Sequence, residues 1–324
     1  MLQAATAGGT QVIWDLWHYG TPDWLDVFSD EFVDRFATYC RHAAELHRSE
    51  TDAVPLWCPI NEIAFFAFIA GECADFHPYA RGRAAELKRQ LVRAGIAGAR
   101  ALRGVDPRAM IVWCEPAINV LPNGPSATAA LAAETRRESQ FEVMDMLTGR
   151  DAPELGGGPD LVDVVGLNFY PHNQFVLDGG TIPMGHHAWR ALSDILEEHW
   201  NRYRLPMLIS ETGAESSGRS AWLHYVCGEV FDAIGRGVPV EGICWYPVTD
   251  YHGWDNGRVC ATGLFSCADD AGRREIDGRL ADELRRQRDQ LDRIRSASRM
   301  SSRAAPGFRP PAELISREPL PADA

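Results

Sequence analysis

Two glutamates in this sequence each follow a short run of apolar residues. Glu211 comes after Met207, Leu208 and Ile209 in the stretch PMLISETGA, and Glu62 ends the stretch VPLWCPINE. Such runs predict buried strands. In a barrel of parallel strands wrapped by helices, the C-terminal strand ends meet at one mouth, so a carboxylate placed there faces a ligand. A lone glutamate after a strand more often caps a loop or pairs with arginine, but two at equivalent places indicate acid–base or nucleophilic chemistry.

Strand-like and helix-like segments alternate along the chain and would position these glutamates. Ser29 is a suitable N-cap for the first long helix. Apolar strands separated by helices imply a parallel sheet covered on both faces, and an alternation this long predicts an α/β fold of the (β/α)8 TIM-barrel type. The expected strands are 11–16, 54–59, 110–114, 161–168, 206–210 and 242–246, and the expected helices are 29–48, 81–103, 126–147, 188–203, 219–236 and 273–295.

The alternation supplies about six βα units, whereas a closed barrel of this type has eight. Because the first expected strand begins at Gln11, we expect the first two units to be absent, and coding sequence upstream of Met1 is the simplest explanation. We therefore expect one barrel domain over residues 1–295, incomplete at its N-terminal side. Residues 296–324 are rich in Ser, Ala, Pro and Arg without periodicity, which predicts a mostly disordered tail.

Composition limits the class of ligand and the compartment. The 324 residues are 45% hydrophobic and carry a formal net charge of -13, which argues against a nucleic acid partner and favours a neutral or small polar ligand. No apolar run approaches the roughly 20 residues that span a bilayer, and no signal peptide is recognisable, so no membrane partner is expected. The eight cysteines lack CxxC spacing and are interpreted as reduced core residues of a cytoplasmic protein, among them Cys58, Cys114, Cys227 and Cys244.

Aromatic and polar residues gather after the expected strands. Aromatic rings stack on the apolar faces of pyranose rings, while Asn, His and carboxylates bond the hydroxyls. Each of these residues, taken alone, is more often structural, but their shared position after strands indicates a small carbohydrate ligand. They are His18, Tyr19 and Trp24 after the first strand, Asn168, Tyr170 and His172 after the fourth, and Tyr246, Asp250 and Trp254 after the last.

Four motifs in this sequence resemble those of the family 1 glycoside hydrolases, the β-glucosidase type of clan A, from their third strand onward. LWHYGTPDWL is similar to the family's His-Trp pattern followed by Leu-Pro, and PINE is similar to its Thr-Leu-Asn-Glu-Pro acid/base motif. GLNFY resembles Gly-Ile-Asn-Tyr-Tyr, and ISETG resembles the nucleophile motif Ile-Thr-Glu-Asn-Gly. The resemblance covers residues 10 to 265, and the order and spacing of the two glutamate motifs are its most specific part.

The resemblance implies a retaining β-glycosidase that hydrolyses O-glycosidic bonds by double displacement, without a cofactor or a metal. Glu211 would be the nucleophile, kept charged by donors around it, and Glu62 would be the general acid/base, held protonated beside Trp57 and Ile63. In the same way Asn61 would bond the sugar 2-hydroxyl and Tyr170 would orient Glu211. The substrate-binding residues implied by matching position are His18, Asn61, Asn168, Tyr170, Tyr246 and Trp254.

Several positions depart from the family pattern. Gly253 precedes Trp254 where the family has a glutamate for the outer sugar hydroxyls, and Tyr246 stands where it has tryptophan. Ile63 stands where the family has proline. The sugar-binding Gln and the Arg that the family takes from its first two strands have no counterpart in this sequence, so glucose selectivity does not follow from the resemblance.

Two other classes of function remain open. A degenerate, non-catalytic sugar-binding barrel is favoured by Gly253 and by the absent units. Whether Glu62 and Glu211 share one pocket distinguishes this class from a catalytic glycosidase. Glu115, after the strand MIVWC, is a third carboxylate that could line this pocket, although it has no motif of its own. A metal-dependent hydrolase lacks support from any His-x-His or HExxH spacing. It would use His18, His172, His186 or His187 with Asp250.

Overall fold

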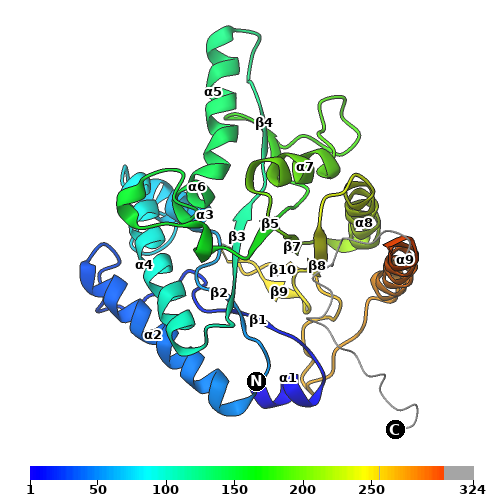
Figure 1. The fold of residues 1–324 in the computed structure, drawn as a ribbon. Helices are drawn as coiled ribbons and strands as arrows, with labels where there is room; N and C mark the ends of the chain where they lie inside the picture. The colour runs from blue at the N-terminus through cyan, green and yellow to red at the C-terminus, as the bar shows by residue number, and fades with distance from the viewer. Residues whose placement is uncertain (255, 303–324) are drawn as a thin grey trace.

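The fold is built on a six-stranded parallel sheet, which curls as in Figure 1. The computed structural model describes residues 1–254 and 256–302. Each strand pairs in parallel with its neighbours in the order β1-β2-β3-β5-β7-β8. The strands lie where the apolar runs predict them. They are β1 (Ile13–Asp15), β2 (Leu56–Cys58), β3 (Met110–Pro116), β5 (Val164–Asn168), β7 (Met207–Thr212) and β8 (Val240–Trp245).

This sheet confirms the expected fold class. The described residues supply six strands of a barrel type that closes with eight, and β1 and β8 are the terminal strands of the sheet in this part of the chain. All six strands run in the same direction, so their C-terminal ends lie at one edge. Residues that end or follow the strands are therefore brought to this edge, which we call the mouth.

Long helices lie outside the sheet, with α2 packed on α4, α7 on α8, and α8 on α9. The Ser29 hydroxyl accepts the N–H of Phe32 at 3.2 Å, so Ser29 is the N-cap of α2 as predicted. Helix α9 extends to Ser302, so the boundary expected at residue 295 lies within a helix, and residues 303–324 lie outside the described residues. The bounds are α2 (Asp30–Glu50), α4 (Ala84–Val105), α7 (Leu192–Tyr203), α8 (Arg219–Gly235) and α9 (Gly278–Ser302).

The single helix predicted over 126–147 is wrong, because a 3-10 turn at Ser139–Phe141 divides it into α5 (Ala127–Glu138) and α6 (Glu142–Leu147). Gln140 is buried in this turn and accepts the N–H of Ile118 at 2.9 Å, which draws the chain toward the sheet. The sequence also did not predict several short elements. They are α1 (Leu2–Ala7), α3 (Ile63–Phe68), a π-helical turn at Ile69–Cys73, 3-10 turns at Pro153–Leu155, Pro159–Leu161 and Ser216–Gly218, and strands β4 (Asn119–Leu121), β6 (Gln174–Val176), β9 (Tyr251–His252) and β10 (Val259–Cys260).

The main core lies between the sheet and the helices, and its close packing is clearest at Gly95 of α4. A Cβ atom at Gly95 would lie 2.7 Å from Cη2 of Trp113 in β3. The Trp113 ring is itself fixed, since its Nε1 donates to the Leu161 carbonyl at 2.9 Å. The glycine therefore permits the contact between this helix and the sheet.

We expect Gly95→Ala to lower the free energy of unfolding by about 1–3 kcal/mol in urea titrations, because overpacking forces the ring or the helix to shift. Gly104→Ala in the same helix is the matched control, since a Cβ atom there meets nothing within 4 Å. That control should leave stability unchanged or raise it by about 1 kcal/mol. Equal stabilities of the two variants would contradict the tight contact with Trp113.

The cysteines are free, and five of the eight are buried. Cys244 is exposed, so the expectation that it lies in the core is wrong. It belongs to the terminal strand β8 and lies near Cys114 and Glu211, on the side of the strand that the described residues leave uncovered.

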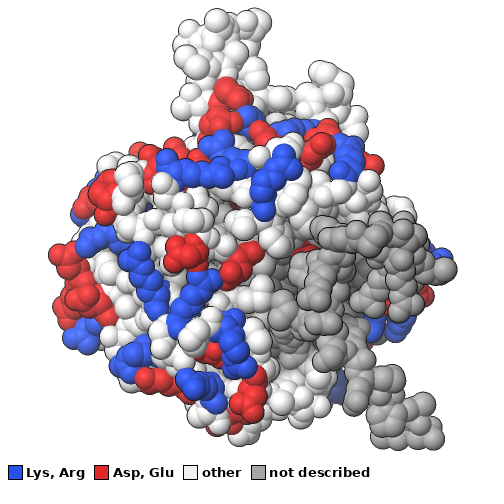
Figure 2. All heavy atoms as spheres, in the orientation of Figure 1, with Lys and Arg blue, Asp and Glu red and all other residues white. Residues whose placement is uncertain are grey.

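Charged side chains of both signs are mixed on the face of the molecule in Figure 2. Charged residues of the chain also form ion pairs, as Arg137 does with Glu134 and Glu198. Within the described residues, none of the helices has the length and apolar character needed to cross a membrane.

Candidate functional site

The residues predicted for the site gather at the mouth of the curled sheet. His18 follows β1, Asn61 and Glu62 follow β2, Asn168 ends β5, and Tyr170 follows it. Glu211 lies at the end of β7, Tyr246 follows β8, and Trp254 follows β9. The contacts and charge interactions described below connect all eight side chains, so the fold assembles one site from residues far apart in the sequence.

The backbone around Glu62 is fixed from two sides. Its N–H donates to the carbonyl of Cys114 in β3 at 2.8 Å, and the N–H of Asn61 donates to the Trp17 carbonyl at 3.1 Å. Glu62 has a φ of 48°, in the left-handed region, directly before α3. A non-glycine residue costs about 1–3 kcal/mol in this conformation, so the surrounding contacts hold it there.

Tyr19 is the hydrogen-bond donor to Glu62. Its hydroxyl donates to Glu62 Oε2 at 2.5 Å, and it accepts from Asn61 Nδ2 at 3.4 Å. The Tyr19 ring stacks on Phe66, with ring centres 5.3 Å apart and planes 16° from parallel. Because the sequence indicated Tyr19 only as one of the aromatic residues near a sugar, this contact is new information from the fold.

Tyr170 is the corresponding donor to Glu211. Its hydroxyl donates to Glu211 Oε2 at 2.7 Å, so the contact implied by the family resemblance is present. Asn168 pairs in register with Glu211 across β5 and β7, and the N–H of Phe169 donates to the Glu211 carbonyl at 2.9 Å. The paired strands thus place Tyr170 beside the carboxylate it contacts.

Burial raises the pKa of both Glu62 and Glu211, and the charge of Glu62 raises the pKa of Glu211 further. Tyr19 and Asn168 act in the opposite direction on Glu62, as Tyr170 does on Glu211. Ionisation of one carboxyl therefore opposes ionisation of the other, and the pair retains one proton to a higher pH than isolated glutamates do.

The hydrogen-bond donor expected beside Glu211 is present, and Glu62 has one as well. One tyrosine hydroxyl donates to each glutamate, Tyr19 to Glu62 and Tyr170 to Glu211. Trp57, expected beside Glu62, packs instead against His47 of α2, with ring centres 5.5 Å apart. The reason is the alternation of side chains along β2, which turns Trp57 toward the helices.

His18 is held by Asp15, which the sequence analysis did not single out. The two side chains lie 2.7 Å apart through His18 Nδ1, which leaves Nε2 for another partner. Burial alone would lower the pKa of His18, but Asp15, Glu211 and Glu62 together raise it. Asp15 could have been found by its position, because it ends its strand as a carboxylate, near the place where Glu62 follows the next strand.

Glu115 is close to the site but is engaged by the backbone. It is 4% exposed, and its Oε2 accepts the N–H of Ala64 in the first turn of α3 at 3.0 Å. Burial, with a smaller effect from Glu62, raises the pKa of Glu115 to about 8. This third carboxyl therefore supports the helix that begins after Glu62.

Aromatic side chains from separate loops form one side of the site. Trp254 is 58% exposed and lies edge-on to Phe76 and Tyr19, with ring centres 5.3 and 6.0 Å away. Burial raises the pKa of Tyr246 to about 12, with a further contribution from Glu211. Trp24, in contrast, is 67% exposed and lies beneath the guanidinium of Arg35 on the outer surface.

The histidines considered for a metal site take other roles. His172 stacks on Tyr170 with ring centres 5.4 Å apart, and His186 contacts His187 at 4.2 Å. Among the residues that the structure describes, no group of three or more His, Cys, Asp or Glu side chains has an arrangement suited to a metal ion.

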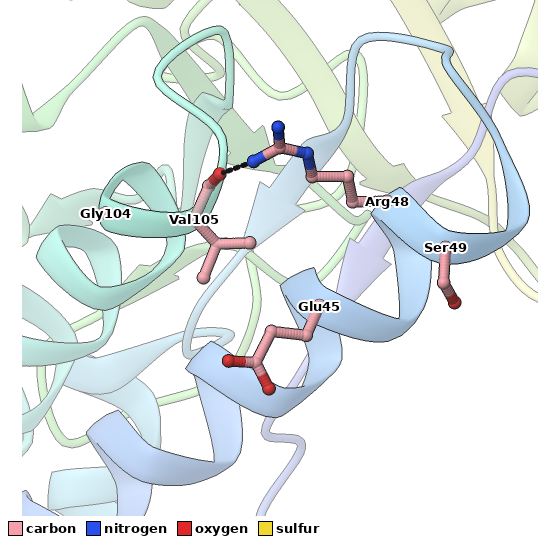
Figure 3. A pocket seen from close by; sticks show the side chains of 5 residues that line it. All are labelled: Glu45, Arg48, Ser49, Gly104 and Val105. Atoms are coloured by element: carbon pink, nitrogen blue, oxygen red, sulfur yellow. Dashed lines mark hydrogen bonds between the residues drawn. The ribbon is translucent and has the colours of Figure 1, made fainter.

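A surface hollow of about 500 Å³ lies away from the glutamates, where α2 and α4 end (Figure 3). It is lined by Glu45, Arg48, Ser49, Gly104 and Val105. Arg48 donates to the Val105 carbonyl at 2.7 Å, and Glu45 pairs with Arg41. The charged side chains that line this hollow therefore already have partners. Neither Glu62 nor Glu211 lines it.

Solved structures with the same architecture include glycosidases. A β-glucosidase from Thermotoga maritima in complex with glucoimidazole matches with a TM-score of 0.73 and 18% identity, covering 87% of this chain and 75% of that one. The AHE enzyme from Alicyclobacillus herbarius matches with a TM-score of 0.70 and 18% identity, covering 89% and 76%. This architecture is the (β/α) barrel of glycosidases.

More particularly, the chain has the fold of the family 1 β-glucosidases. The family 1 β-glucosidase of Thermotoga maritima matches with a TM-score of 0.71 and 18% identity, covering 87% of this chain and 74% of that one. The resemblance found in the motifs is confirmed at the level of fold. A β-galactosidase from Sulfolobus acidocaldarius is 27% identical over 90 residues, which span 26% of this chain and only 18% of that protein. No family model matches the sequence.

Proposed function

We propose that this chain is a glycoside hydrolase, and specifically a retaining β-glycosidase that acts on small glycosides. The observation that carries the proposal is the position of Glu62 and Glu211 at one mouth, where each accepts a hydrogen bond from a tyrosine hydroxyl and the charge of Glu62 raises the pKa of Glu211. The fold of the family 1 β-glucosidases supports it, as does the glucoimidazole bound by the Thermotoga maritima enzyme.

In the first step, Glu211 attacks the anomeric carbon while Glu62 gives its proton to the leaving oxygen. Because the Tyr170 hydroxyl bonds Oε2 of Glu211, Oε1 is the attacking oxygen. In the second step, Glu62 takes a proton from water, the water oxygen attacks the anomeric carbon, and Glu211 leaves. The first step requires the one proton that the pair retains to lie on Glu62 and the negative charge to lie on Glu211.

The remaining residues of the mouth suit a sugar ring. Asn61, Asn168 and His18 offer hydrogen-bonding groups to hydroxyls, and we assign Asn61 to the 2-hydroxyl. Trp254 and Tyr246 offer ring faces beside the glutamates. Gly253 supplies no carboxylate for the outer hydroxyls, so the proposal extends to β-glycosides in general and not to glucosides alone.

The stereochemistry of hydrolysis tests this function. In proton NMR of the reaction with 4-nitrophenyl β-glucoside and β-galactoside, we expect the β-anomer of the free sugar to form first, because two displacements restore the configuration. First appearance of the α-anomer would exclude Glu211 as nucleophile. Calorimetric sugar binding without any hydrolysis would favour the non-catalytic barrel instead.

A further inference from the structure

The contact between Tyr19 and Glu62 joins two residues with unusual backbones. Tyr19 has a φ of 73° and Glu62 a φ of 48°, both in the left-handed region that side chains larger than glycine seldom adopt. Their side chains meet at 2.5 Å, the distance of a strong hydrogen bond to a charged group. Such conformations persist where surrounding structure enforces them, and they concentrate at functional sites.

The Tyr19 ring is fixed by aromatic neighbours on several sides. Phe66 stacks on it at 5.3 Å, Trp17 and Phe76 approach it edge-on at 6.3 Å, and Trp254 approaches at 6.0 Å. The hydroxyl therefore has a defined position at Glu62 Oε2. In the family's His-Trp pattern a tryptophan follows the histidine, whereas Tyr19 follows His18 in this chain, and an indole has no hydroxyl to donate.

We propose that Tyr19 is the positioning residue of the acid/base glutamate: it occupies Glu62 Oε2, directs the transferable proton to Oε1, and makes Glu62 a stronger acid. This inference rests on the proposed function and concerns how one of its two glutamates works. As the proton leaves Oε1 for the glycosidic oxygen, the carboxylate gains negative charge, and the hydrogen bond from Tyr19 strengthens. Tyr19 keeps its own proton throughout.

Tyr19 is suited to donate without ionising. Burial, together with the charge of Glu62, raises the pKa of its hydroxyl, so the donor stays protonated. Several other groups also face Glu62, and an experiment must separate Tyr19 from them. The titratable ones are Asp15 and His18 from β1 and its loop, Glu115 from β3, Tyr170 after β5, Glu211 from β7 and Tyr246 after β8.

Carboxyl-carbon NMR of the full chain, labelled with ¹³C at the glutamate side-chain carboxyl, tests the contact without relying on turnover. Glu62→Gln and Glu211→Gln assign the two signals. We expect Tyr19→Phe to move the midpoint of the Glu62 signal to higher pH by about one pH unit, because the ionised form loses a donor while burial continues to oppose the charge. Tyr170→Phe is the matched control and should move the Glu211 signal more than the Glu62 signal.

A series of leaving groups tests the consequence for catalysis. With Tyr19→Phe, kcat/KM for methyl β-glucoside should fall roughly tenfold, since this leaving group needs a full proton from a weakened acid. For 2,4-dinitrophenyl β-glucoside, which leaves with little protonation, the loss should stay below about twofold. Tyr170→Phe should slow both substrates similarly, because each requires the nucleophile.

The two measurements separate the positioning of Glu62 from the proposed function. An unchanged Glu62 midpoint in Tyr19→Phe, or equal losses with both leaving groups, would overturn the role of Tyr19. A shifted midpoint in a chain that hydrolyses neither glucoside would leave the positioning of Glu62 intact and count against the glycosidase proposal.

Discussion

Glu211→Gln is expected to lower hydrolysis of activated aryl β-glycosides by roughly 10⁴-fold or more, because the neutral amide cannot form the glycosyl ester on which double displacement depends. The substitution preserves the shape of the side chain, and its amide oxygen still accepts the hydrogen bond that Tyr170 donates at 2.7 Å. The loss should therefore reflect chemistry, and the variant should melt near the temperature of the unchanged chain.

Glu215→Gln is a matched control for this experiment. Glu215 lies four residues further along, is exposed, and pairs with Arg258 on the surface at 2.7 Å. Removing its charge should alter the rate by less than about twofold, since exposed ion pairs contribute little. A Glu211→Gln variant that keeps a rate near that of Glu215→Gln would exclude Glu211 as the nucleophile.

The strands of the fold could be predicted because each is a local signal. A run such as Met207 to Ile209 is apolar at every position, which a strand covered on both faces requires, and it lies between turn-forming residues. The interruption of helix 126–147 could not be predicted in this way. It depends on the buried side chain of Gln140 meeting the backbone of Ile118, a tertiary contact that no local pattern records.

In the candidate site, too, some contacts could be predicted from the sequence and others depend on the tertiary structure. The family motifs indicated the contact between Tyr170 and Glu211, and the register of Asn168 with Glu211 on neighbouring strands brings it about. The bond from Tyr19 to Glu62 required two left-handed residues to meet across separate loops. The exposure of Cys244 likewise follows from the place of β8 at the end of the sheet, which the strand pattern alone does not reveal.

Glu62→Ala is expected to separate the two steps of the reaction. For methyl β-glucoside, turnover should fall by roughly 10²–10⁴-fold, the usual contribution of a general acid. For 2,4-dinitrophenyl β-glucoside, formation of the glycosyl-enzyme should be nearly unaffected, because this leaving group departs with little protonation. Hydrolysis of the glycosyl-enzyme should then become the rate-limiting step, since no carboxylate activates the water.

Added azide should restore turnover of 2,4-dinitrophenyl β-glucoside by Glu62→Ala and yield the β-glycosyl azide. The anion attacks the anomeric carbon without a base, and removal of the carboxylate leaves space for it between Tyr19 and Asn61. Release of dinitrophenol measures the rate, and NMR of the product identifies the anomer. The chain with Glu62 intact is the control, because its carboxylate repels azide and already activates water. An azide effect of the same size in both proteins, or none in Glu62→Ala, would contradict the acid/base role, because only a missing base makes the incoming nucleophile limiting.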